Sequence, residues 1–332
     1  MSAPSPFAGL FASTPPPAAL EITSRRVSAV GLAARGASRA VTGHVVESLA
    51  PGVVTPSLNA MNVHDPAALA EAIKAAADRL SPRPRRIALI LPDSVAKVSL
   101  LRFEKTPPKA QELDQLIKWQ MRKAAPFRLE DAQVSWTDGA PIQGGGQEYL
   151  VVVARRDIVE SYERACDAAG VHAGIVDIAS LNLVNALLAT QPDSAGDSLL
   201  VHAAADYTTL LVVRGDRVIF FRSRSADAAD DTSMGDLVHQ TAMYYEDRLG
   251  GGAFARVVLS GAGSGTATGD EFRRQIEDRL GVRVEPLDVR NGVALRDRIA
   301  VSGELLDALA PAAGVLLRER PRPSGRKPER VA

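Results

Sequence analysis

The chain has 332 residues, of which 46% are apolar and 23% are charged, proportions typical of a soluble globular protein of about two domains. Its 39 basic and 39 acidic residues balance, which argues against nucleic acid or a membrane surface as a direct ligand. The single cysteine excludes an internal disulfide, and the five histidines lack the spacing of metal ligands, so no metal site is expected.

The beginning of the chain predicts a flexible leader and then a frame rich in β-strands. Residues 1–17 are rich in Ser, Ala and Pro, a composition typical of a flexible segment. Asp65 followed by Pro66 predicts a helix start, with the aspartate as N-cap and the proline at the first helical position. The expected elements are three strands, this helix and a short buried strand, at 18–23, 27–33, 41–48, 66–80 and 87–91.

A small αβ block then interrupts the frame. It is expected to contain a strand, a helix, two strands and a second helix, at 95–103, 109–124, 133–136, 149–154 and 157–169. The frame resumes with a strand and a helix before a boundary rich in Pro, Gly and Asp. We therefore assign 18–91 and 173–190 to a first lobe, and 92–172 to an inserted subdomain that binds a partner.

The second half of the chain repeats the order of the first. Its expected strands and helices lie at 198–203, 207–213, 217–222, 233–249, 256–260, 270–280, 282–287 and 303–317. The shared βββαβα plan predicts an α/β fold of two lobes, of the duplicated RNase H-like kind found in actin, around a cleft. We assign 198–318 to the second lobe and 319–332 to a basic, disordered tail.

Several short segments, in order and with matching spacing, resemble the PilM-type proteins of type IV pilus assembly. They lie at Leu91–Val98, Gln120–Asp131, Val151–Asp157, Ala168–Val171, Val176–Ile178 and Leu309–Arg318. The resemblance implies an actin-like fold related to FtsA, with an inserted subdomain in the position of residues 92–172.

The resemblance also implies a function as a cytoplasmic adaptor of the pilus assembly platform. Its partner would be the N-terminal cytoplasmic peptide of a PilN-like inner-membrane protein, bound in a groove between the inserted subdomain and the first lobe. Contact with the membrane would be made only through such partners, so the chain would be cytoplasmic and peripheral to the inner membrane. No secretory signal or bilayer-spanning apolar run is expected in the sequence.

Two hairpins depart from the pattern of an active actin-like ATPase, in which each hairpin carries an Asp-x-Gly turn. The first hairpin has Glu21, Thr23 and Ser24 near this turn, and the second has His202 and Ala204. A threonine side chain would block the close approach of a phosphate, and a neutral imidazole is a poor ligand for Mg²⁺. The loop that would contact the adenosine keeps its glycines only in part, at Gly261 and Gly263 with Ala262 between them. We therefore expect a pseudo-ATPase with no required cofactor.

Four apolar residues of the inserted block are the candidate contacts with the partner peptide, namely Val98, Leu100, Trp119 and Phe127. Trp119 lies away from the centre of the apolar stripe of its helix, which would leave it facing a groove. The competing interpretation is that Trp119 and Phe127 pack on the small sheet as core residues.

Two other functions stay open at this point. The two-lobed plan is shared by active ATPases and by sugar-kinase-like phosphotransferases, for which bound ATP and Mg²⁺ would be required. An adaptor of type II secretion, similar to the cytoplasmic domain of GspL, is the other alternative. The sequence also leaves open whether the chain associates with itself.

Overall fold

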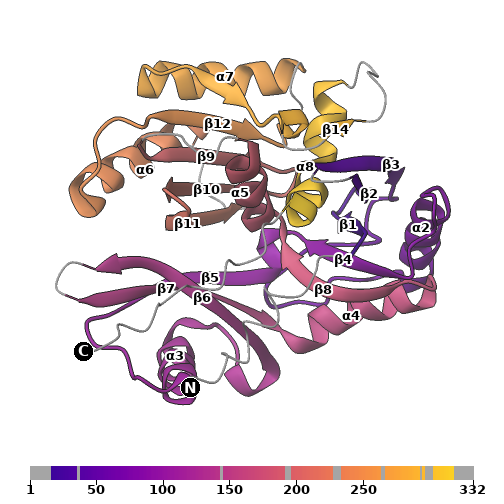
Figure 1. The fold of residues 1–332 in the computed structure, drawn as a ribbon, viewed down its shortest axis with the longest axis horizontal. Coiled ribbons are helices and arrows are strands. Elements are labelled where there is room, and N and C mark those ends of the chain that lie inside the picture. The colour runs from indigo at the N-terminus through magenta and orange to yellow at the C-terminus, as the bar shows by residue number, and fades with distance from the viewer. Residues whose placement is uncertain are drawn as a thin grey trace, which may run out of the picture.

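The computed structural model describes residues 16–35, 38–142, 145–190, 196–226, 233–262, 266–291, 294–295 and 302–317. They form three β-sheets and seven α-helices, arranged as two lobes and a smaller third unit (Figure 1). The candidate residue Gly263 and the predicted leader and tail lie outside the described residues, apart from the last two positions of the leader.

The first lobe is built on a six-stranded sheet in which the first three strands are antiparallel neighbours. The strand order is β14-β3-β2-β1-β4-β8, and β1, β4 and β8 run parallel to one another. These strands span Ala18–Ile22 (β1), Arg26–Arg35 (β2), Ser38–Ser48 (β3), Arg86–Leu91 (β4), His172–Ile178 (β8) and Ala294–Leu295 (β14). β8 is the last strand at its end of the sheet.

The second lobe has the same topology. Its sheet has the order β11-β10-β9-β12-β13, so both sheets place their first five frame strands in the order third, second, first, fourth, fifth. The strands span Ser198–Ala203 (β9), Tyr207–Arg214 (β10), Arg217–Ser225 (β11), Arg256–Ser260 (β12) and Val284–Pro286 (β13). The predicted duplication of a βββαβα plan is confirmed.

The third unit is a three-stranded antiparallel sheet that follows β4 after a short 3-10 turn, η1 (Asp93–Val95). Its order is β5-β7-β6, so β6 is a terminal strand, and the strands span Ala96–Phe103 (β5), Ala132–Ile142 (β6) and Gly146–Arg155 (β7). Alternation along β7 sends Val151 and Val153 to a core beneath helix α3 (Ala110–Ala124), and Leu150 and Val152 to the opposite face.

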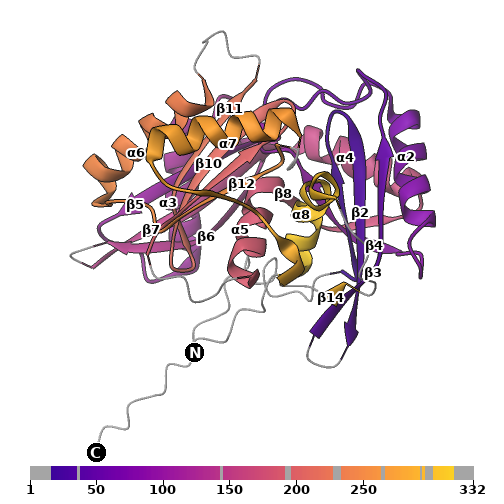
Figure 2. The same ribbon diagram turned by 90° about the horizontal axis from the view of Figure 1, so that it is seen from above.

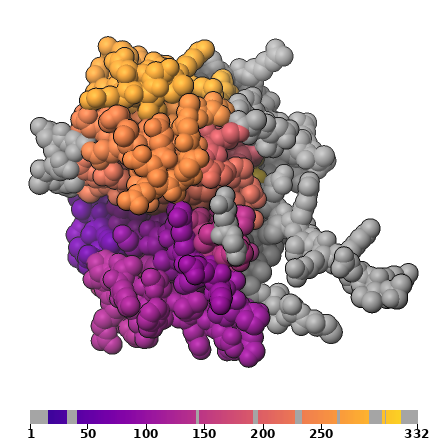
Figure 3. All heavy atoms as spheres, turned by 90° about the vertical axis from the view of Figure 1, so that its left-hand side faces the viewer, coloured from indigo at the N-terminus to yellow at the C-terminus, as the bar shows by residue number. Residues whose placement is uncertain are grey.

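That opposite face packs against the second lobe. Val98 and Leu150 of the small sheet share a core with Leu211 of β10 and with helix α5 (Ala179–Thr190). Figure 3 shows the second lobe, in orange and yellow, seated on the purple and magenta inserted unit. The small sheet is therefore packed on both faces, against α3 on one and against the second lobe on the other, and this close packing restrains its position.

Helix α4 (Arg156–Ala168) follows the small sheet in sequence but packs in the first lobe. Tyr162 and Cys166 of α4 share one core with Leu69 and Ile73 of helix α2 (Pro66–Asp78). Asp65 caps α2 by accepting a hydrogen bond from the Ala68 backbone N–H at 3.0 Å, as the sequence predicts. By its packing, α4 belongs to the first lobe. The boundaries assigned from the sequence, 92–172, instead include α4 in the inserted subdomain.

The two lobes are joined by a pair of helices that lie side by side between their sheets, α5 and α8 (Gly303–Leu317), as Figures 1 and 2 show. Leu183 and Leu187 of α5 pack on the sheet of the second lobe, although α5 follows the first. Ala312 and Val315 of α8 pack on the sheet of the first lobe, although α8 follows the second. Helices α6 (Met234–Leu249) and α7 (Ala267–Leu280) cover the remaining face of the second sheet.

The close contact of α5 and α8 predicts the effect of a small substitution. A Cβ atom at Gly314 would lie 1.9 Å from the Asn182 carbonyl oxygen, which is backbone and has no room to move. Gly314→Ala should therefore lower the free energy of unfolding by about 2 kcal/mol in chemical denaturation. Gly252→Ala is the matched control, since no atom lies within 4 Å of the new methyl group. Equal stability of the two variants would contradict the tight packing of these helices.

Candidate functional site

The two hairpins singled out in the sequence meet in a buried polar cluster between the lobes. Glu21, at the end of β1, is 2% exposed, and its carboxylate lies 3.8 Å from the Arg26 guanidinium. Thr23 shapes the turn, because its hydroxyl oxygen accepts from the Arg26 N–H at 3.1 Å. Ser24 follows in this turn with a buried hydroxyl that has no partner among the described residues. Thr23 thus stabilises the turn of the first hairpin through hydrogen bonds within the turn.

In the second hairpin, the His202 ring fills the space beside Gly261. His202 is 5% exposed, and its Nε2 lies 3.2 Å from the Tyr207 hydroxyl. Gly261 has φ +83°, and a Cβ at this position would lie 2.9 Å from the imidazole. Ala204 lies in the turn, where its N–H donates to the Tyr207 carbonyl at 3.0 Å. The imidazole and the Ala203 carbonyl therefore occupy the space beside Gly261.

Asp93 joins the lobes across this cluster. One carboxylate oxygen accepts from the Ser180 N–H at 3.0 Å, at the start of α5, and the other accepts from the Thr209 hydroxyl of β10 at 2.7 Å. Asp93 was not among the residues predicted for the site. Its signal in the sequence is its position directly after the buried strand at 87–91, where side chains of parallel sheets reach a cleft.

Burial changes the ionisation of the three central groups. It raises the pKa of Glu21 to about 7, against the opposing effect of Arg26, and the Asp93 charge raises it further. Burial also raises the pKa of Asp93 to about 6, although the hydrogen bonds from Ser180 and Thr209 oppose the shift. For His202, burial lowers the pKa to about 4, so the imidazole is neutral near pH 7. Near pH 7 the cluster therefore holds a neutral imidazole, a partly protonated Glu21 and a largely ionised Asp93, whose two oxygens already accept hydrogen bonds.

A second site is a cleft of about 430 Å³ between the small sheet and the first lobe. One wall is the edge strand β8, which contributes a continuous run of lining residues, 173–178. The facing wall is the edge strand β6, which contributes Gln133, Ser135 and Thr137. No described strand pairs with the outer edge of β6 or of β8, and arginine side chains bond to one carbonyl on each, Arg217 to Asp138 and Arg86 to Gly174.

The floor of this cleft is apolar and comes from all three units. The aliphatic lining residues on β4, β7, β8, α5 and β11 include Leu91, Leu150, Val152, Ile175, Val176, Ile178, Leu181, Val184, Leu188 and Val218. Several of them belong to the core that joins the small sheet to the second lobe. The cleft thus combines an apolar floor with two unpaired strand edges.

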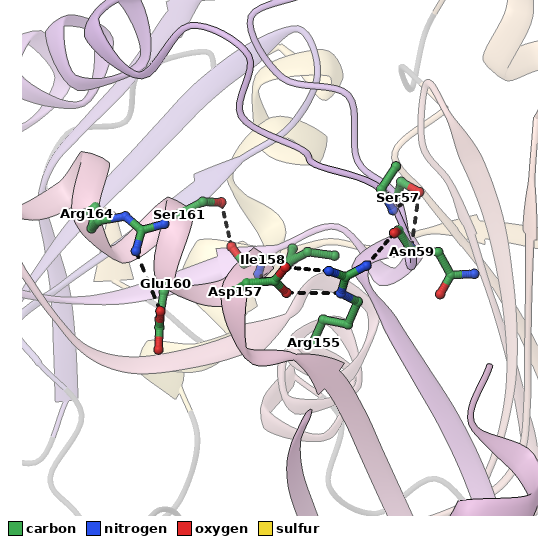
Figure 4. Close-up of polar contacts among 9 residues, drawn as sticks. Ser57, Asn59, Arg155, Asp157, Ile158, Glu160, Ser161 and Arg164 are labelled. Atoms are coloured by element: carbon green, nitrogen blue, oxygen red, sulfur yellow. Dashed lines mark hydrogen bonds and ion pairs between the residues drawn. The ribbon is translucent and has the colours of Figure 1, made fainter. Parts of the chain in front are cut away.

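The end of the cleft at α4 is braced by Arg155, the last residue of β7. Its guanidinium donates to both oxygens of Asp157, with 3.0 Å from Nε to Oδ1, and to the Asn59 carbonyl at 2.6 Å (Figure 4). Asn59 lies in the loop between β3 and α2. This set of bonds fixes the junction between the small sheet and the first lobe, and neighbouring Ala154 and Val159 line the cleft.

The four residues predicted to contact a partner lie outside the cleft lining. Val98 is 9% exposed, and Leu100 packs beside it in the core against the second lobe. Phe127 packs against the core beneath α3. Trp119 is 53% exposed on α3, with the Lys123 ammonium 4.4 Å from its ring centroid. The structure therefore does not bring these four side chains together.

Comparison with known proteins identifies the family of the chain. Residues 19–234 match the family described as type IV pilus assembly protein PilM. The chain belongs to the PilM family. A chain of a solved PilM-PilN type IV pilus biogenesis complex has the same fold, with a TM-score of 0.74 and 20% sequence identity. The match covers 92% of this chain and 98% of that chain, so the actin-like fold extends over nearly the whole PilM-type chain.

Other solved structures are more distant from this PilM family member. The cytoplasmic domain of EpsL, an inner-membrane component of the type II secretion system of Vibrio cholerae, has a TM-score of 0.45 and 11% identity, over 73% of this chain and 80% of that one. The ethanolamine utilization protein EutJ from Carboxydothermus hydrogenoformans has a TM-score of 0.47 and 10% sequence identity. This match covers 94% of this chain and 95% of that chain. No curated protein matches the sequence.

The described ranges lack two further kinds of feature. No set of three or more His, Cys, Asp or Glu side chains in these ranges is arranged to hold a metal ion. Among the helices that the structure describes, none is both long and apolar enough to cross a bilayer.

The buried cluster predicts opposite pH dependences for two variants of this PilM family member. Because the pKa of Glu21 is raised, the folded state loses stability as the pH rises from about 4.5 through 7. Glu21→Gln should thus equal the wild type near pH 4 and exceed its unfolding free energy at pH 8 by up to about 3 kcal/mol. Denaturant titrations at several pH values measure this difference.

His202→Gln provides the opposing control. Because the pKa of His202 is lowered, the wild type loses stability as the pH falls from about 6.5 towards 4. The unfolding free energy of His202→Gln should therefore rise relative to that of the wild type as the pH falls towards 4, and this relative gain should be absent at pH 8. A pH-independent difference for both variants would show that the two side chains are hydrated rather than buried.

Proposed function

We propose that the chain is an adaptor of the type IV pilus assembly platform, which binds the N-terminal cytoplasmic peptide of a PilN-like membrane protein in the cleft between β6 and β8. The observation that carries this proposal is the pair of unpaired strand edges on opposite walls of one cleft. Membership of the PilM family, and the fold shared with a chain of a PilM-PilN complex, support PilN as the partner.

An extended peptide fits the chemistry of this cleft. Each unpaired strand edge presents N–H and C=O groups about every second residue, so a peptide in β-conformation forms main-chain hydrogen bonds with it. The aliphatic floor provides pockets for alternate apolar side chains of the peptide. Backbone pairing then supplies affinity that is independent of sequence, and the floor selects the register.

A bulge in β8 suits this edge to receive a ligand. The pairing of β8 with β4 shifts by one residue between Ile87 and Ala88, because Ala173 and Ile175 are the successive partners and Gly174 is unpaired. Bulges of this kind bend an edge strand and are frequent beside binding sites. Gly174 lies on the cleft wall, where the Arg86 side chain packs against its backbone and Nη2 donates to its carbonyl at 3.4 Å, so a peptide pairing here would displace this side chain.

We further propose that the adaptor does not hydrolyse ATP efficiently. Glu21, His202 and Asp93 are almost fully buried, and Asp93 bonds to both lobes, so a nucleotide could reach the hairpins only after the lobes separate. The His202 ring beside Gly261 would also have to move. This arrangement favours a structural use of the interlobe cluster over the alternative of an active ATPase or phosphotransferase.

Placement at the inner membrane follows from the same proposal. A PilN-type peptide belongs to a membrane-anchored partner, so its capture would hold the chain at the cytoplasmic face of the membrane without a membrane contact of its own. Use of the same cleft by a type II secretion partner is the competing function. The family assignment favours the pilus.

Peptide binding tests the adaptor proposal directly. A fluorescent synthetic peptide of the N-terminal cytoplasmic segment of a PilN-like protein from the same organism should bind saturably in an anisotropy titration. Ser135→Trp should weaken binding at least about tenfold, because the indole fills the cleft between β6 and β8.

Trp119→Ala is the matched control for this experiment. Trp119 lies on α3 and does not line the cleft, so its loss should leave the affinity unchanged. If Trp119→Ala weakens binding and Ser135→Trp leaves it intact, the peptide binds at α3 and not in the cleft. No saturable binding at high micromolar concentration would contradict the adaptor function.

Nucleotide binding is tested by a thermal-shift titration with Mg-ATP. A ligand at a hundred times its dissociation constant stabilises a protein by about 2.7 kcal/mol, which raises the melting temperature by a few degrees. We expect no shift at millimolar Mg-ATP. A saturable shift that His202→Ala enlarges would instead show that the interlobe cleft still admits the nucleotide.

A further inference from the structure

We propose that the cleft selects a peptide in which a Lys or Arg side chain adjoins the apolar residues, and that Glu163 of α4 pairs with this cation. The inference rests on the proposed function, since it names the chemistry of the peptide that the cleft accepts. It makes Glu163 a determinant of specificity at the end of the cleft near α4. None of the residues predicted from the sequence has this role.

The charge of the cleft lining is strongly one-sided. Its described residues include four carboxylates and one guanidinium, Glu163, Asp138, Asp177, Asp216 and Arg217. Arg217 is already engaged, since its Nε lies 3.2 Å from Asp216 and its Nη1 donates to the Asp138 carbonyl at 2.6 Å. The lining therefore has an excess of negative charge, although the whole chain is neutral.

Glu163 stands apart from the other three carboxylates by its position and surroundings. It lies on α4, one turn beyond Val159, and no ion pair joins it to another residue that the structure describes. Partial burial raises the pKa of its carboxyl, and Glu160 and Asp167 raise it further, against a smaller opposing effect of His172. The negative charges of Glu160 and Asp167 thus repel the Glu163 carboxylate, and a cation in the cleft would offset this repulsion.

The geometry places this carboxylate beside one end of an extended ligand. The β6 wall from Gln133 to Asp138 has six residues and would be about 20 Å long in a fully extended strand. Gln133 pairs with Ala154, just before α4, whereas Asp138 adjoins Arg217 at the opposite end. A peptide lying along the cleft therefore meets Glu163 at the α4 end, where no cation among the described residues forms an ion pair with this carboxylate.

Matched peptides and variants test this pairing. The first probe is the acetylated N-terminal segment of the PilN-like protein, and the second is the same peptide with each Lys and Arg replaced by Gln. Acetylation removes the α-amino charge, so only side-chain cations differ. The wild type should bind the first peptide at least about tenfold more tightly than the second, an advantage that falls with added NaCl.

Glu163→Gln should remove most of this preference, leaving the affinity for the neutral peptide nearly unchanged. Glu160→Gln is the matched control, since Glu160 lies on the same helix, pairs with Arg164 at 3.6 Å and does not line the cleft. The control should keep the full preference. Circular dichroism and thermal melting establish that both variants are folded.

The outcomes separate the charge inference from the proposed function. Equal binding of both peptides by the wild type, or an equal preference in Glu163→Gln and Glu160→Gln, overturns the role of Glu163 while leaving peptide binding in place. A native segment with no Lys or Arg near its apolar residues overturns it as well. Absence of saturable binding of either peptide overturns the proposed function and, with it, the inference.

Discussion

The apolar contact between the small inserted sheet and the second lobe is the constraint on which the proposed site depends. Val98 and Leu150 on one face of this sheet pack with Leu211 and with α5, while Val151 and Val153 pack beneath α3 on the other. A sheet covered on both faces can present only its edges. One of these edges, β6, therefore faces the edge strand β8 of the first lobe across a cleft of fixed width.

The interlobe polar cluster stabilises the same arrangement at the start of α5. Asp93 follows β4 and accepts hydrogen bonds from the start of α5 and from Thr209 of the second lobe. α5 also provides part of the cleft floor, through Leu181 and Leu188. The positions that would contact a nucleotide in an active relative and the peptide cleft thus share one helix, and closure of the lobes keeps the cleft in its observed shape.

Local signals in the sequence predict the elements well, and contacts between distant residues account for what they miss. Asp65 and Pro66 define the start of α2, and the repeated strand order defines both lobes. By contrast, the partners of Asp93 lie 87 and 116 residues away in the chain. The face of β5 that carries Val98 and Leu100 is apolar because it packs against the second lobe. An alternating sequence pattern cannot distinguish such a packing face from a face that binds a ligand.

Hydrogen exchange measured with and without the PilN-type peptide tests the central claim most directly. Main-chain pairing of the peptide in the cleft predicts slower exchange of backbone amides within residues 173–178 of β8 or 133–138 of β6, with little change in α3. Slower exchange confined to α3, or to the hairpins that contain Glu21 and His202, would contradict the account.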